Sequence, residues 1–270
     1  MPAPRTTAKG AGAALAATAV AAVGLLTAQA LEARRRIGRR TSTAPYADGR
    51  YGTGAGTSIR LAVLGDSGAA GLGADTPRDT MGAILATALA EVSGRTVTLS
   101  NHAVIGAQTK DLDAQVDRAL WTRPHVAVIM IGANDVTHLV PRRISARRLQ
   151  RAIRRLRAAG TDVVMATCPD LGTVKPVPEP LRSLMRHRSR LLAEAQAQAT
   201  RAEGGRAVPL GSRLGPEFDE RPDVMFAEDR FHPSTQGYAA AASALLPEVI
   251  AAWRLGGEGE ILPVVPDVTG

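Results

Sequence analysis

The sequence predicts a three-layer α/β/α fold built on a parallel, flavodoxin-like sheet, and two observations lead to this prediction. From residue 59 to residue 255, short apolar runs alternate with longer segments of helical periodicity. That alternation is typical of parallel strands joined by right-handed helical crossovers. Residues 126–131 are apolar without interruption, as in a central parallel strand that helices cover on both faces. The chain of 270 residues is long enough for one such domain with a buried core.

Five strands and five helices are expected, in alternation. The strands are short segments, either apolar throughout or alternating in polarity: 59–64, 96–99, 126–131, 162–167 and 207–210. The helices carry apolar residues three or four positions apart: 80–92, 109–120, 146–159, 181–201 and 234–255. In a sheet of this kind, ligands bind beyond the carboxyl ends of the strands. The loops that follow the strands are therefore the places to look for chemistry.

The first 31 residues are expected to direct export or to attach the chain to a membrane. Residues 10–31 contain no charged side chain, and Arg5 and Lys9 precede them. This pattern fits a secretory signal peptide with a cleavage motif, Ala-Gln-Ala, at 28–30. It also fits a retained membrane anchor, because about 20 apolar residues can span a bilayer. The arginines within 34–40 would favour a cytoplasmic position for that side of the segment, so the topology stays open.

The remaining boundaries follow from composition. Residues 32–58 are first basic and then rich in Gly, Ser and Thr without periodicity, which is typical of a linker. The folded domain is expected over 59–255. Residues 256–270 are rich in Gly and Pro, and we expect a loose C-terminal tail there.

The positive charge is concentrated near the N-terminus. The first 50 residues hold eight Lys and Arg against two acidic residues, a balance of +6, which leaves +2 of the formal charge of +8 for the other residues. A nucleic-acid-binding domain needs a basic face, and this balance does not indicate one. The single cysteine, Cys168, excludes an intrachain disulfide, and we expect it to be buried and inert. The sequence has no Cys/His cluster with the spacing of a metal site, so no metal is expected.

Four short polar motifs attract attention, three directly after predicted strands and the fourth after the last predicted strand but farther along the chain. They are Gly-Asp-Ser at 65–67, the segment 101–106 that ends in a glycine, Gly-Ala-Asn-Asp at 132–135, and Asp-Arg-Phe-His at 229–232. Each block alone is a weak signal. Together, in this order, they resemble the blocks of the SGNH/GDSL hydrolase superfamily, and the resemblance covers residues 59–254.

The resemblance implies a serine ester hydrolase that needs no cofactor. Ser67 would be the nucleophile, His232 the base that takes its proton, and Asp229 the partner that orients the imidazole. The backbone N–H groups of Ser67 and Gly106 and the side-chain amide of Asn134 would form the oxyanion hole. Implied substrates are carboxylic esters: short acyl esters, lipids or acetyl esters.

Two neighbouring carboxylates are expected to serve the structure rather than the reaction. Asp66 would cap the helix that follows it, and Asp135 would fix the loop that presents Asn134. Asp223 and Glu228 stay open as rival partners for His232. The loops 68–80, 136–145 and 170–182 are expected to line the substrate pocket.

Other functions stay open beside the hydrolase. Acyl transfer to an alcohol would use the same three residues. The glycines from 65 to 73 could form a nucleotide-binding turn, but their spacing is not G-x-G-x-x-G and no P-loop lysine follows. The arginines within 142–157 could serve a non-catalytic module that binds a membrane surface, although a solvated helix face explains them as well. The sequence does not indicate an oligomeric state.

Overall fold

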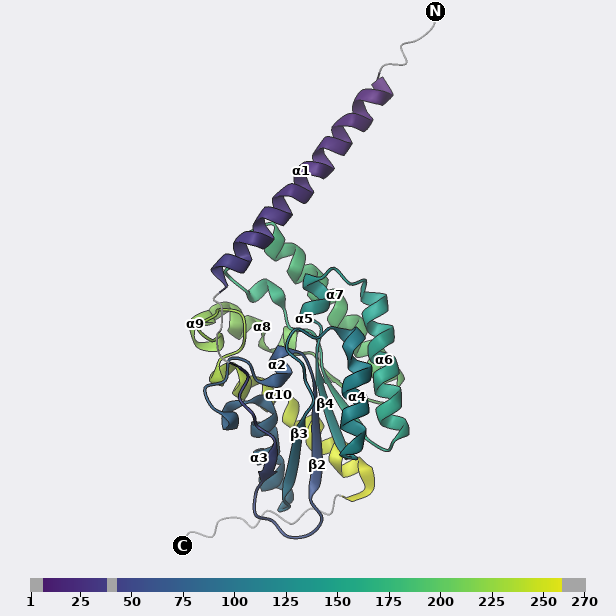
Figure 1. Ribbon diagram of the computed structural model, residues 1–270, viewed down its shortest axis with the longest axis vertical. Helices are drawn as coiled ribbons and strands as arrows, with labels where there is room; N and C mark the ends of the chain where they lie inside the picture. The colour runs from purple at the N-terminus through teal and green to yellow at the C-terminus, as the bar shows by residue number, and fades with distance from the viewer. Residues whose placement is uncertain (1–6, 38–42, 259–270) are drawn as a thin grey trace, which may run out of the picture.

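A six-stranded sheet lies between layers of helices in the computed structural model, which describes residues 7–37 and 43–258 (Figure 1). The strands have the order β1-β3-β2-β4-β5-β6, and every pair is parallel except β1 with β3. Their bounds are β1 Gly49–Tyr51, β2 Ile59–Gly65, β3 Val97–Asn101, β4 Val126–Met130, β5 Asp162–Ala166 and β6 Arg206–Val208. Counted among themselves, the five parallel strands have the order 2-1-3-4-5, which is that of a flavodoxin-like sheet. The predicted fold class is therefore confirmed.

Both faces of the sheet are buried, which explains why its central strand β4 is apolar throughout and β2 is apolar except for Arg60. Along β2, Leu61 and Val63 face one core cluster, whereas Ala62 and Leu64 face the other. Helices α3 and α10 pack on the first face, and α4 and α6 pack on the second with α7 beside α6. The bounds of these helices are α3 Met81–Ser93, α4 Leu112–Trp121, α6 Arg142–Ala158, α7 Leu181–Ala202 and α10 Thr235–Trp253.

Hydroxyl side chains start the two helices on the first face. The Oγ1 of Thr80 accepts a hydrogen bond of 3.3 Å from the N–H of Ala83 at the start of α3. The Oγ of Ser234 accepts one of 3.1 Å from the N–H of Gly237 at the start of α10. Such caps satisfy backbone donors that the first turn of a helix leaves free. Because Ser234 is two residues beyond His232, its cap also fixes the end of the segment that carries the histidine.

The linker expected over residues 32–58 is wrong in part. Residues 49–51 form β1, an edge strand that pairs antiparallel with β3 in the register Gly49↔Leu99. The Oδ1 of Asp48 also accepts a hydrogen bond of 2.8 Å from the N–H of Asn101 in β3. A strand of three residues beside a glycine is too short to show periodicity, so its pattern resembled a linker. The helix expected after Asp66 is α2 Ser67–Ala70. Three further helices were missed: α5 Ala133–Thr137 and α9 Pro222–Met225, which are short for the same reason, and α8 Leu210–Glu220, which carries Pro216 inside it.

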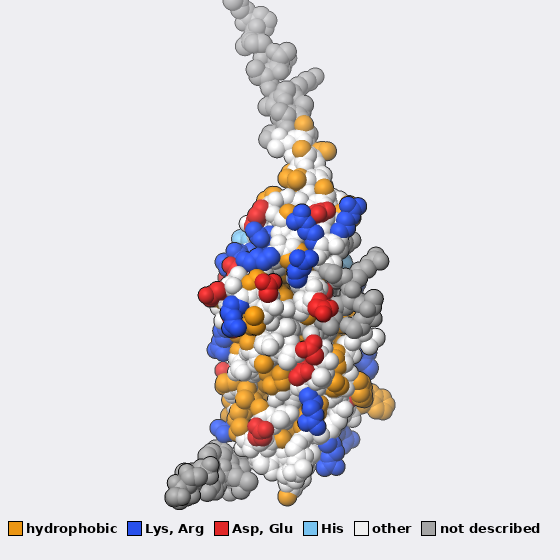
Figure 2. Space-filling model, turned by 90° about the vertical axis from the view of Figure 1, so that its left-hand side faces the viewer, with side chains coloured by type: hydrophobic (Ala, Val, Ile, Leu, Met, Phe, Trp, Pro, Cys, Tyr) orange, Lys and Arg blue, Asp and Glu red, His pale blue; other side chains and the backbone are white. Residues whose placement is uncertain are grey.

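The N-terminal helix α1 (Thr7–Arg36) projects from the body at the end where the parallel strands finish (Figure 1). Its side chains are exposed over most of residues 20–28, and Val20, Val23 and Leu25 are 72%, 65% and 49% exposed. Figure 2 shows the projecting helix with hydrophobic and other uncharged side chains, above a region with basic and acidic side chains. Within residues 7–37 and 43–258, no helix combines the length and the hydropathy of a membrane span. Export or membrane attachment through residues 1–31 stays a prediction.

The C-terminal end is described only in part. The chain continues beyond α10 in a π-helical turn over Arg254–Glu258. The predicted tail covers 256–270, and its residues from 259 onward lie outside the described part of the chain. Residues 1–6 of the predicted targeting segment and residues 38–42 of the predicted linker also lie outside it.

Candidate active site

The loop that carries Ser67 is fastened to the middle of the sheet. Directly after β2, the N–H of Asp66 donates to the carbonyl of Met130 at the end of β4 (3.1 Å). The side chain of Gln115 accepts from the N–H of Gly65 (2.7 Å) and donates to its carbonyl (2.9 Å). Gly65 has a φ of +143°, and a Cβ there would stand 1.9 Å from the carbonyl oxygen of Met130. Only glycine fits this turn, so the chain can leave the sheet abruptly and start α2 at Ser67.

The second part of the site is a turn between α9 and α10. Asp229 accepts hydrogen bonds through Oδ1 from the N–H groups of Phe231 (3.0 Å) and His232 (2.9 Å). Its Oδ2 lies 2.7 Å from Nδ1 of His232, and Nε2 of the same ring lies 2.9 Å from the Oγ of Ser67. The structure therefore brings Ser67, His232 and Asp229 into one hydrogen-bonded chain, although 165 positions separate the serine from the histidine. The hydrogen-bond partner of His232 Nδ1 is therefore Asp229, and not Asp223 or Glu228, the alternatives that the sequence left open.

The hydrogen bonds decide where the imidazole carries its proton. An ionised carboxylate can only accept, so Nδ1 of His232 must donate to Asp229. A neutral imidazole then has an acceptor at Nε2, and the hydroxyl of Ser67 donates to it. Nε2 is thus ready to receive the serine proton.

Asp229 is ionised in this arrangement. Burial alone would raise the pKa of its carboxyl group, because a charge is costly away from water. The hydrogen bonds from the ring of His232 and from the N–H groups of His232 and Phe231 outweigh burial and lower the pKa of Asp229 below its ordinary value. The carboxylate is therefore charged at neutral pH and can stabilise an imidazolium beside it.

The residues expected to form the oxyanion hole lie in three segments that hydrogen bonds join to one another. The N–H of Val104 donates to the carbonyl of Gly65 (3.1 Å), which places the loop after β3 beside the nucleophile loop. Gly106 in that loop has a φ of +82°, a conformation that favours glycine. Nδ2 of Asn134, in α5, donates to the carbonyl of Ala107 (3.0 Å). This bond uses one of the two amide hydrogens of Asn134 and leaves the other for a ligand.

Asp66 caps α2, as expected. Its Oδ1 accepts a hydrogen bond of 3.1 Å from the N–H of Gly68. Burial raises the pKa of Asp66 to about 6. The hydrogen bond from Gly68 and the nearby imidazole of His232 act in the opposite direction, but their effect is smaller than that of burial. A carboxyl group with such a pKa beside the nucleophile changes its charge in mildly acidic solution.

Asp135 and Cys168 are buried beneath the site. Asp135 accepts hydrogen bonds from the hydroxyls of Thr109 (2.6 Å) and Ser145 (2.7 Å), so it joins the loop before α4 to α6 behind Asn134. This agrees with the structural role expected of it. Cys168 is 1% exposed. Burial, and then the carboxylates Asp66, Asp135 and Asp170, raise the pKa of its thiol well above the ordinary value, so it is the inert thiol that was expected.

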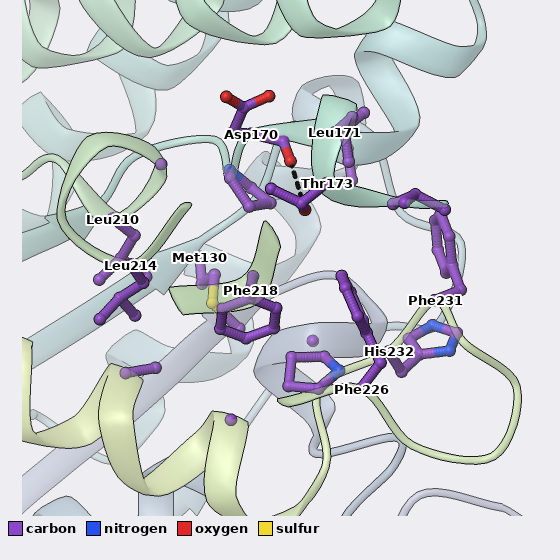
Figure 3. Close-up of a pocket in the computed structure, with 18 of the residues that line it drawn as sticks. Met130, Asp170, Leu171, Thr173, Leu210, Leu214, Phe218, Phe226, Phe231 and His232 are labelled. Carbon is purple, nitrogen blue, oxygen red and sulfur yellow. Dashed lines mark hydrogen bonds between the residues drawn. The ribbon is translucent and has the colours of Figure 1, made fainter. Parts of the chain in front are cut away.

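An apolar cavity opens beside Ser67 and His232. Figure 3 shows His232 and Phe231 at one end, Leu210 and Leu214 at the other, and Phe218 between them. The cavity has a volume of about 110 Å³, and no Lys or Arg of the described residues lines it. Of the expected pocket loops, 170–182 contributes Asp170, Leu171, Thr173 and Val174, and 68–80 contributes Gly68. The carboxylate of Asp170 is paired with Arg190 (2.9 Å). The expectation for 136–145 is wrong for this cavity, because that segment borders a separate hollow beside α7.

Sequence reasoning missed the aromatic side of this cavity. All three phenylalanines of the chain, Phe218, Phe226 and Phe231, line it. Phe218 and Phe226 meet edge to face, with ring centroids 4.9 Å apart. They come from α8, α9 and the turn with His232, a region to which no element was assigned. Their confinement to 14 residues of a chain otherwise without phenylalanine was the signal that could have found them.

Comparison with known proteins agrees with this geometry. Residues 63–240 match the family model of the GDSL-like lipase/acylhydrolase family. The chain is 42% identical over 260 residues to the GDSL-like esterase Rv1075c of Mycobacterium tuberculosis, an alignment that covers 91% of this chain and 83% of that protein.

Solved structures resemble the chain in fold. Axe2, an acetylxylan esterase from Geobacillus stearothermophilus, is 20% identical with a TM-score of 0.55, over 72% of this chain and 95% of its own. A lipase/acylhydrolase from Enterococcus faecalis is 18% identical with a TM-score of 0.54, over 71% of this chain and 95% of its own. The match over residues 63–240 and the 42% identical esterase show that the chain is a carboxylic ester hydrolase and belongs to the GDSL-like lipase/acylhydrolase family.

Proposed function

We propose that the protein hydrolyses esters of short, apolar carboxylic acids through an acyl-serine intermediate on Ser67. The observation that carries the proposal is the chain of two hydrogen bonds, 2.9 Å from Ser67 Oγ to His232 Nε2 and 2.7 Å from His232 Nδ1 to Asp229 Oδ2. A serine hydroxyl attacks a carbonyl only when a base takes its proton, and here the base lies within reach and is itself held by a carboxylate.

The first half of the reaction forms the acyl-enzyme. Ser67 Oγ attacks the ester carbonyl carbon while Nε2 of His232 takes the hydroxyl proton. The carbonyl π electrons move to the oxygen, and the N–H groups of Ser67 and Gly106 and the amide of Asn134 donate to that oxyanion. When the tetrahedral intermediate collapses, the imidazolium gives its proton to the leaving alkoxide. An alcohol departs, and the acyl group stays on Ser67.

The second half regenerates the enzyme. A water molecule gives its proton to His232 and attacks the acyl carbon, and the tetrahedral intermediate expels Ser67 Oγ, which regains the proton. A carboxylic acid is released. An alcohol in place of water would give a new ester by the same steps, so the nature of the acceptor separates a hydrolase from an acyltransferase.

The cavity supports an apolar acyl group in the substrate. It starts at Ser67 and His232 and continues between phenylalanine and leucine side chains. Burial of each methylene group contributes about 0.8 kcal/mol, whereas a charged or hydroxylated acyl group would lose hydrogen bonds to water there. We therefore propose acyl chains from acetate to hexanoate.

A series of p-nitrophenyl esters from acetate to dodecanoate tests the proposal. We expect turnover on acetate to hexanoate. Ser67→Ala should lower kcat at least about a thousandfold, because loss of the nucleophile alone costs about as much as loss of the whole triad. Ser212→Ala is the matched control, since Ser212 is an exposed serine on α8. Mass spectrometry after an acid quench should find the acyl group on the Ser67 peptide. Unchanged turnover in Ser67→Ala would place the nucleophile elsewhere.

A further inference from the structure

The last turns of α1 lie against the outer wall of the apolar cavity. Ala33 is 5% exposed and belongs to one buried cluster with Val174, Val177 and Phe226. Val174 and Phe226 also line the cavity from the other side. A single layer of side chains therefore separates α1 from the space that an acyl chain would occupy.

Gln29 fastens α1 to the segment that continues this wall. Its Oε1 accepts a hydrogen bond of 3.1 Å from the N–H of Leu181, and its Nε2 donates to the carbonyl of Glu179. One amide side chain thus satisfies a backbone donor and a backbone acceptor 150 or more positions away. The two bonds fix the position of α1 along the wall as well as its distance from it.

Arg230 joins the end of α1 to the catalytic turn. It stands between Asp229 and His232 with a φ of +57°, a conformation that residues with a side chain adopt at a cost. Its Nη2 donates to the carbonyl of Arg36 (3.2 Å), in the last turn of α1. The carbonyls at a helix C-terminus lack partners within the helix and attract cations, so this contact supports the turn in its strained conformation.

We propose that the base of α1, from Gln29 to Ile37, is a specificity-determining element that holds the cavity wall and so sets the preference for acyl length. The inference rests on the proposed function, because it concerns the site that receives the acyl group. It assigns no such role to residues 20–28, most of which are exposed. It also requires that α1 stays joined to the domain in the active protein, since cleavage after Ala30 would remove Gln29.

A matched pair of substitutions tests the proposal in the full chain. Ala33→Arg places a large charged side chain in the buried contact, whereas Ala28→Arg makes the same change at an exposed position one turn earlier. Gln29→Ala removes the two hydrogen bonds without adding bulk. For each variant, KM and kcat are measured with p-nitrophenyl acetate and hexanoate, and thermal unfolding is followed in parallel.

We expect KM for the hexanoate to rise about tenfold in Ala33→Arg and about threefold in Gln29→Ala, because the wall that an acyl chain contacts is released. KM for the acetate should change less than about twofold, and Ala28→Arg should match the wild type. An equal loss with both esters, a loss that only follows the melting temperature, or unchanged selectivity would overturn the proposal.

A binding measurement separates this proposal from the proposed function. In a Ser67→Ala background, calorimetric titration with heptan-2-one, a ketone that carries the same hexanoyl group and cannot be hydrolysed, reports the cavity without turnover. Weaker binding on addition of Ala33→Arg, and not of Ala28→Arg, would support the wall even if Ser67 proved not to be the nucleophile. Equal affinity in all three proteins would overturn the wall while leaving the hydrolase proposal intact.

Discussion

The two halves of the active site are built in different ways. Ser67 follows β2 directly, and its loop is bonded to the neighbouring strand through Asp66 and Met130 and to α4 through Gln115. Asp229 and His232 lie on a turn that follows no strand. That turn is closed by its own bonds, from the N–H of Ala227 to the carbonyl of His232 (2.9 Å) and by a bridge between Phe226 and Pro233.

From this difference we expect a change in the nucleophile loop to lower both the stability of the fold and the catalytic rate. A change in the turn that carries His232 should lower the catalytic rate alone. The nucleophile loop shares its hydrogen bonds with the middle of the sheet, so a change there disturbs the core. The His232 turn lies between α9 and α10 and, apart from the hydrogen bond to Ser67, none of its bonds named here joins it to the sheet or to the loop after β2. A change there can therefore stop the reaction while the sheet persists. Four substitutions test the contrast.

The largest effect is expected on the turn, from Asp229→Asn. The amide oxygen of the asparagine would keep the hydrogen bonds from the N–H groups of Phe231 and His232, so its NH2 group would face Nδ1. Nδ1 would then have to accept, and this tautomer would leave Nε2 protonated and unable to accept the serine proton. We expect kcat to fall about 10³- to 10⁴-fold with little change in urea unfolding. Asp223→Asn, at an exposed position nearby, is the control. A loss of several kcal/mol of stability together with the activity would contradict the separation.

Gly65→Ala tests the opposite side. The new Cβ would stand 1.9 Å from the carbonyl oxygen of Met130, in a backbone conformation that alanine avoids. We expect the free energy of unfolding to fall by more than about 3 kcal/mol, or the protein not to accumulate. Gly106→Ala is a matched control with a positive φ, because its Cβ would meet no atom within 4 Å. Normal stability of Gly65→Ala in a urea titration would refute the coupling.

Gly73→Ala tests a contact between the two halves. A Cβ at Gly73 would lie 2.2 Å from the carbonyl oxygen of Pro233 and 3.2 Å from Cβ of His232. The turn must move away, and a displacement of about 1 Å can reduce a rate about a hundredfold. We expect kcat/KM to fall by about that factor, with a smaller loss of stability than in Gly65→Ala. If kcat/KM is unchanged, the turn is more compliant than its hydrogen bonds indicate.

The smallest effect is expected from Asp66→Asn. The folded-state pKa of Asp66, about 6, lies above the ordinary value of 3.8, so its contribution to stability is complete below about pH 4 and is lost as the pH rises through 6. The asparagine variant should gain about 2 kcal/mol relative to wild type between pH 4 and pH 7. Urea unfolding at the two pH values measures this, with Asp223→Asn as control. A constant difference would mean that Asp66 does not titrate there.

The same contrast explains what the sequence could predict. The central strand β4 was predictable because burial on both faces leaves an uninterrupted apolar run, and β3 because its residues alternate in polarity. The position of Ser67 followed from the end of β2. The His232 turn has no periodic signal, so only its resemblance to a family block identified it. The aromatic wall and β1 were missed because α9 and residues 49–51 are short and α8 contains Pro216, which interrupts a helical pattern. Their places depend on tertiary contacts rather than on local pattern.

The single thiol of the chain, Cys168, has a practical consequence. It is enclosed and resists deprotonation, so alkylating dyes would pass it by in the folded protein. Labels directed at introduced cysteines should therefore not react with the folded protein at Cys168. Cysteines introduced at exposed Ala28 on α1 and at exposed Ser212 on α8 would carry a pair of distance labels. The pair would report the position of α1 in solution, and Cys168 would not have to be replaced first.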